Sequence, residues 1–97
     1  MLIKAGVDIS RLNREIRRAL PRIQTILNYQ SEELVITSTY EGNHGLGSLH
    51  YCNDAIDMRL PGNNVGLVVG EIKEKLGKDY DVVQEGNHIH IEWDPKR

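Results

Sequence analysis

The sequence predicts an α+β domain in which two main helices pack on a small, largely antiparallel sheet. Two observations lead to this fold class. Apolar residues recur at intervals of three and four over residues 11–29 and again over residues 65–76, which is the period of an amphipathic helix. Between and after these stretches lie short segments that are β-branched or alternate between apolar and polar residues. These expected strands cover residues 34–39, 54–60, 80–84 and 88–93.

The ends of the elements follow from capping and turn residues. Ser10 is placed to cap the first helix, and Pro21 is expected to kink that helix or to split it in two. Gly77 is placed to end the second helix as a C-terminal cap. The link at residues 85–87 is short enough for a hairpin between the last two strands. Residues 40–53 form a loop that is long for a small domain, and such loops often carry function.

Length and composition limit the classes of protein. The 97 residues are enough for one domain, residues 1–97, and too few for two. A net charge of −2 argues against nucleic acid as the main partner, because binding phosphates needs a basic face. The chain has no apolar run long enough to span a membrane and no signal peptide at its start. We therefore expect a protein that is made in the cytoplasm, does not enter a membrane and acts as a monomer.

Histidines and an aspartate suggest a metal site. His50 and Asp57 lie seven positions apart, at the end of the long loop and in the strand that follows. His88 and His90 alternate on the last strand, so both point to the same face of the sheet. A catalytic zinc ion commonly has three such nitrogen and oxygen ligands and one open position. The ligands would be His50, Asp57 and one of the two strand histidines. The alternative is that these are ordinary surface residues of a structural domain.

Two segments match a family pattern. Residues 48–57 (Ser-Leu-His-Tyr-Cys-Asn-Asp-Ala-Ile-Asp) resemble the S-x-H-x-x-G-x-A-x-D motif of D-alanyl-D-alanine carboxypeptidases, L-alanyl-D-glutamate endopeptidases and hedgehog-type zinc domains. Residues 88–92 (His-Ile-His-Ile-Glu) are similar to the second motif of the same superfamily. The opening Gly-Val-Asp-Ile-Ser and the segment Leu-Val-Ile-Thr-Ser are also similar to small phage and prophage members. The resemblance implies a hedgehog/DD-peptidase-like fold and one zinc ion held by His50, Asp57 and His90. It also implies that Ser48 borders the site and contacts substrate.

The departures from the pattern concern the groups that move protons and bind substrate. Many members place an acidic general base three positions before the last ligand, and here that residue is Asn87. His88 and Glu85 are then the candidate catalytic groups, and Asn87 becomes a candidate substrate contact. Carboxypeptidase relatives use an arginine to hold the terminal carboxylate of the substrate, a role that Arg59 could take here. Asn53 stands where the family has glycine, and asparagine tolerates the positive φ that this turn requires.

The resemblance implies a zinc-dependent peptidase that acts on the stem peptides of peptidoglycan. It would be either a DD-carboxypeptidase or an endolysin-like endopeptidase. It would reach the cell wall after phage-mediated release or as a component of the virion. The alternative, favoured by the amide at Asn87, is a catalytically impaired zinc-binding domain that serves as a phage structural module or a cell-wall-binding module.

Overall fold

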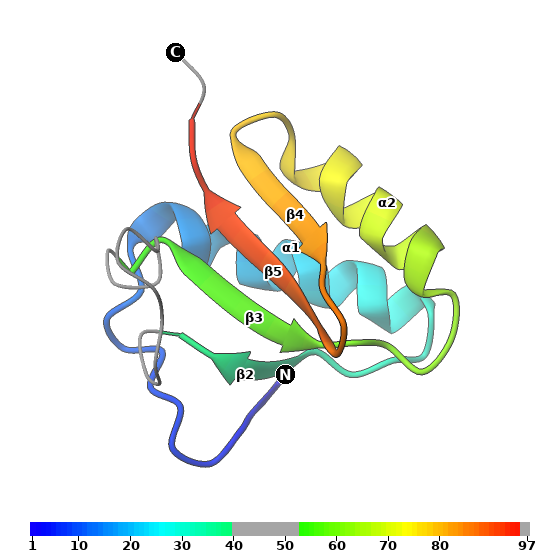
Figure 1. The fold of residues 1–97 in the computed structure, drawn as a ribbon, viewed down its shortest axis with the longest axis horizontal. Coiled ribbons are helices and arrows are strands. Elements are labelled where there is room, and N and C mark those ends of the chain that lie inside the picture. The colour runs from blue at the N-terminus through cyan, green and yellow to red at the C-terminus, as the bar shows by residue number, and fades with distance from the viewer. Residues whose placement is uncertain (40–52, 96–97) are drawn as a thin grey trace.

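The computed structural model describes residues 1–39 and 53–95 of the chain. In this part, two helices cover one face of a five-stranded sheet with strand order β1-β2-β3-β5-β4 (Figure 1). The helices are α1 (Arg14–Tyr29) and α2 (Val65–Leu76). The strands are β1 (Leu2–Ile3), β2 (Val35–Ser38), β3 (Ala55–Arg59), β4 (Tyr80–Gln84) and β5 (His88–Trp93). All strand pairs are antiparallel except β1 with β2, so the predicted fold class is confirmed.

Helix α1 differs from the prediction at its start and in its middle. It begins after Asn13, three residues later than a cap at Ser10 would place it. The Ser10 amide instead donates to the Asp8 carboxylate at 2.8 Å, which holds a turn before the helix. The helix also continues unbroken past Pro21, so the split was wrong. Pro21 is exposed, and solvent can therefore hydrate the carbonyl that loses its backbone partner.

The C-terminal half of the chain follows the prediction closely. Helix α2 ends at Gly77, whose positive φ of 85° is the backbone conformation that glycine adopts without strain. The Gly77 amide donates to the Lys73 carbonyl at 3.0 Å and completes the cap. Strands β4 and β5 form the expected hairpin, and the Glu85 amide closes it by donating to the His88 carbonyl at 2.8 Å. Strand β1 was not predicted, because its two exposed residues are too few to show the alternation of apolar and polar residues that marks a strand.

The two faces of the sheet have opposite characters. One face packs on the helices through a single apolar core, to which every strand except β1 contributes. The strand residues in this core are Ile36, Ile56, Met58, Val82, Ile89 and Ile91. The alternate residues of β3 and β5, among them Asp57, His88 and His90, point to the face opposite α1 and α2. This open face carries the candidate site. None of the helices in the described ranges could cross a lipid bilayer.

Candidate metal centre

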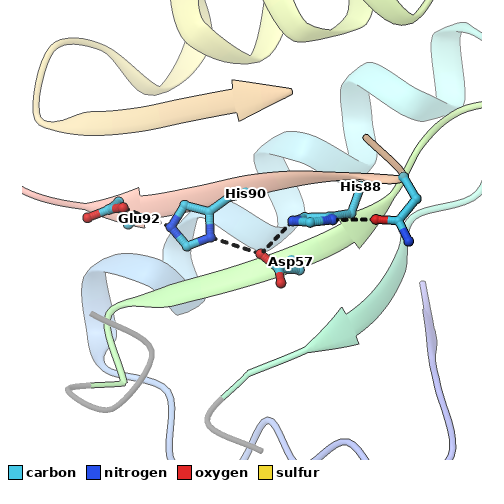
Figure 2. A network of polar contacts seen from close by, with 5 residues as sticks. Asp57, His88, His90 and Glu92 are labelled. Atoms are coloured by element: carbon cyan, nitrogen blue, oxygen red, sulfur yellow. Dashed lines mark hydrogen bonds and ion pairs between the residues drawn. The ribbon is translucent and has the colours of Figure 1, made fainter. Parts of the chain in front are cut away.

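Asp57 and His90 lie side by side in the middle of the open face. They are direct partners in the β3–β5 register, which places their side chains next to each other. The Nδ1 atom of His90 is 2.8 Å from the Oδ1 atom of Asp57 (Figure 2). Both side chains are largely sheltered, with 18% and 15% of their surfaces exposed. Two residues 33 positions apart thus form one nitrogen–oxygen pair, held by two paired strands rather than by loops.

The imidazole of His90 is held at both nitrogens. Its Nε2 atom lies 2.8 Å from the Oε1 atom of Glu92, which is two residues further along β5 and therefore on the same face (Figure 2). The hydrogen bond to Asp57 raises the pKa of His90 above its ordinary 6.5, burial opposes this rise, and the bond to Glu92 adds to it. Without a metal ion, His90 therefore holds its second proton more strongly than a free histidine does, and in the cationic form it donates a hydrogen bond to each carboxylate.

His88 lies on the same face but in different surroundings. It starts β5 opposite Arg59, and its Nδ1 atom is 2.7 Å from the amide oxygen of Asn87. Its Nε2 atom is 3.8 Å from the Oδ1 atom of Asp57, which is an ion-pair distance rather than a hydrogen bond. Asp57 therefore has both strand histidines near it and makes its short contact with His90.

The other site residues that the sequence predicted, where the structure describes them, lie around the pair formed by Asp57 and His90. Glu85 and Asn87 are exposed in the β4–β5 turn, and Asn87 reaches the site through its contact with His88. Arg59 is exposed at the end of β3. It lines a shallow groove on the β1–β2 side of the sheet, together with Leu2 and Val35. Ser48 and His50, the other two predicted site residues, lie outside the described residues.

The structure also shows an acidic group that sequence reasoning did not single out. Carboxylate oxygens of Asp81, Glu92 and Asp94 lie within 4.8 Å of one another, close enough to share a metal ion. This is the one such group of three potential ligands within residues 1–39 and 53–95. The signal was present in the sequence, because Glu92 and Asp94 are two apart and Asp81 faces Glu92 in the hairpin. Exposed acidic groups of this kind are common without a metal, so we assign no site here.

The pair formed by Asp57 and His90 has the donor chemistry of a zinc site. Zinc accepts imidazole nitrogen and carboxylate oxygen, and these are the two atoms that face each other at 2.8 Å. The three acidic oxygens are instead the ligands that harder cations such as calcium prefer. No protein-family model, curated protein or solved structure matches the chain.

Asn53 lies in the turn before β3, and substitutions there test whether its backbone conformation is strained. Its φ is 62°, the positive value expected at this position from the sequence. Its side-chain oxygen is buried without a hydrogen-bond partner among the described residues. We expect Asn53→Gly to leave the free energy of unfolding within about 0.5 kcal/mol, because relief of strain offsets the extra entropy of the unfolded chain. Asn53→Ala should lower it by about 1 kcal/mol. Urea denaturation measures both, and equal stability of the two variants would contradict the strain argument.

The raised pKa of His90 predicts that acid stabilises the metal-free protein and weakens any binding of zinc at the Nδ1 atom of His90. In the metal-free protein, the proton on His90 stabilises the fold below pH 6.5, and this contribution is lost as the pH rises through the raised pKa. Binding of zinc requires that the proton leave. Zinc affinity should therefore fall about tenfold or more per pH unit below that pKa. Melting curves with and without zinc across this range measure the effect. A zinc-induced rise in Tm that does not shrink in acid would contradict it.

Proposed function

We propose that this protein is a zinc-dependent peptidase that cleaves the stem peptides of peptidoglycan, with one zinc ion held by His50, Asp57 and His90. The observation that supports the proposal is the contact between Asp57 and His90. These residues come from the two separate motifs of the sequence, yet their Oδ1 and Nδ1 atoms lie 2.8 Å apart on paired strands. When bound, zinc would activate a water molecule and polarise the peptide carbonyl.

His88 is the best-placed group to move protons in the proposed reaction. The amide oxygen of Asn87 can only accept a hydrogen bond, so its 2.7 Å contact places the proton of a neutral His88 on Nδ1. The Nε2 atom then carries a lone pair and faces the side of Asp57, 3.8 Å from that carboxylate. From there His88 would accept a proton from the attacking water and return it to the leaving amine. Glu85 is the alternative group, and its position in the exposed turn favours it less.

Substrate contacts in this proposal come from the rim of the open face. Arg59 pairs with His88 in the strand register and is exposed, so its guanidinium could hold a carboxylate of the stem peptide in a bidentate manner. Asn87 would act mainly through His88, and Ser48, which lies outside the described residues, would add a hydroxyl. The proposed place of action is the cell wall, which the protein would reach after phage-mediated release or as part of the virion.

A second candidate function is a zinc-binding module that does not hydrolyse its ligand. The observation that favours it is the side chain at position 87. Asn87 cannot accept a proton at neutral pH, and its oxygen is already used to hold His88. The module would keep the zinc site for stability and act by binding the cell wall or another virion protein.

One assay separates these candidates. Zinc-loaded protein is incubated with purified peptidoglycan, and new amino and carboxyl termini are counted against a metal-free control. Release that requires zinc supports the peptidase. One equivalent of retained zinc without release supports the binding module. In that second case, gain of activity in the Asn87→Asp variant would show that the base alone is missing. A protein that retains no zinc, and whose melting is unaffected by a chelator, would be a plain structural domain.

A further inference from the structure

The carboxylate of Glu92 occupies the side of His90 that faces away from Asp57. The two acidic partners contact opposite ring nitrogens, with Asp57 at Nδ1 and Glu92 at Nε2, each at 2.8 Å (Figure 2). Glu92 and His90 are neighbours on one face of the same strand, so their contact does not depend on a distant loop. The side chain of Glu92 is 23% exposed, which limits the competition of water for this hydrogen bond. One of the two contacts that orient the imidazole ring thus lies within β5 itself.

The contact between Glu92 and Nε2 determines which ring nitrogen of His90 can bind a metal ion together with Asp57. An ion shared with Asp57 has to lie on the Nδ1 side of the ring, because Nε2 points to Glu92. An imidazole that binds a metal through Nδ1 carries its proton on Nε2, and in metal proteins such a proton is commonly donated to a carboxylate, a backbone carbonyl or water. Glu92 lies at hydrogen-bond distance from that atom.

The partners of the ring nitrogens also distinguish the two histidines of β5, which their spacing in the sequence does not. His88 has an amide, not a carboxylate, at its second nitrogen, and its Nε2 atom is 3.8 Å from Asp57 rather than 2.8 Å. His90 has both the short contact to Asp57 and the carboxylate behind it. The geometry therefore favours His90 as the ligand without reference to any family pattern.

We infer that Glu92 is the positioning residue of the zinc site: it accepts the Nε2 proton of His90 and so directs Nδ1 to the metal. This inference rests on the proposed zinc site and adds to it the residue that orients a ligand. Glu92 does not bind the zinc ion itself and does not touch substrate. Glu92 adds one residue of β5 to the proposed zinc site. The same side chain also belongs to the acidic group that it forms with Asp81 and Asp94.

The test compares zinc affinity and the visible spectrum of the cobalt(II)-substituted protein in Glu92→Ala, Glu92→Gln and the unmodified chain. We expect Glu92→Ala to weaken zinc binding by about 10- to 100-fold in competition with a chelator, and to change the cobalt bands. The amide oxygen of Glu92→Gln can still accept the Nε2 proton, so this variant should restore most of the affinity and the original spectrum. Asp81→Asn is the matched control, because it removes a carboxylate from the same acidic group and leaves both contacts of His90 in place. It should behave as the unmodified protein does.

Several results would overturn the inference. Zinc binding and a cobalt spectrum unchanged in Glu92→Ala would exclude a positioning role, while the proposed zinc site would stand. Equal losses in Asp81→Asn and Glu92→Ala would show a general effect of negative charge instead. If Glu92→Ala does not fold, nitrogen NMR of His90 in the zinc-loaded, unmodified protein decides, since coordination through Nε2 contradicts the inference. If the unmodified protein binds no zinc, both the inference and the proposed function fail.

Discussion

Asp57→Ala is expected to remove zinc from the protein and to abolish the hydrolysis of peptidoglycan. Asp57 supplies the carboxylate oxygen that lies 2.8 Å from the Nδ1 atom of His90, and the same oxygen is 3.8 Å from the Nε2 atom of His88. Loss of a partner that only orients a ligand costs roughly 100-fold in affinity at most, and loss of the ligand itself should cost more. Zinc content after gel filtration and release of peptide termini are the measurements.

The control for this variant is Asp81→Asn, which removes one carboxylate from β4, two strands away in the sheet, and should retain both zinc and activity. The melting temperature of the metal-free variants shows whether the fold survives. The core lies on the other face of the sheet, so we expect Asp57→Ala to stay folded. Zinc retained at one equivalent by folded Asp57→Ala protein would remove Asp57 from the site.

His88→Gln is expected to separate zinc binding from turnover. If His88 moves protons, kcat should fall by about 100- to 10,000-fold, the usual contribution of general acid–base catalysis. Zinc affinity should stay close to that of the unmodified protein, because His88 lies 3.8 Å from Asp57 and is held by Asn87 rather than by a ligand. Kinetics on a soluble stem-peptide substrate, together with zinc titration of the same sample, measure both quantities.

Glu85→Gln is the matched variant, since Glu85 is the alternative proton carrier on the same hairpin. It should keep most of its activity. A large loss in Glu85→Gln with normal turnover in His88→Gln would reverse the assignment. Loss of zinc in His88→Gln would instead make His88 a ligand, contrary to the arrangement seen on β5.

The fold was predictable wherever periodicity was strong. Helix α2 and both strands of the hairpin have the predicted bounds. In each of them, regularly spaced apolar residues are bounded on both sides by residues that favour turns or helix caps. The start of α1 was wrong because serine caps compete with other local turns, and Ser10 belongs to a turn with Asp8. The two-residue strand β1 depends on pairing with β2, which is a tertiary effect that a local pattern does not contain.

The candidate site was predictable in part. Alternation along a strand placed His88 and His90 on one face, and the family pattern chose His90, but neither could tell that β3 and β5 would align Asp57 directly with His90. That alignment depends on the register between strands that are far apart in the chain. The role of Glu92 was missed for a related reason: a hydrogen bond to a ring nitrogen depends on rotamers as well as on spacing.

The most direct test of the shared zinc ion is an anomalous difference map at the zinc edge from crystals of the zinc-loaded protein. We predict a single peak on the open face of the sheet. It should lie about 2.0–2.2 Å from a carboxylate oxygen of Asp57, from the Nδ1 atom of His90 and from a ring nitrogen of His50. A peak between Asp81, Glu92 and Asp94, or a peak that His50 does not reach, would contradict a zinc ion shared by His50, Asp57 and His90.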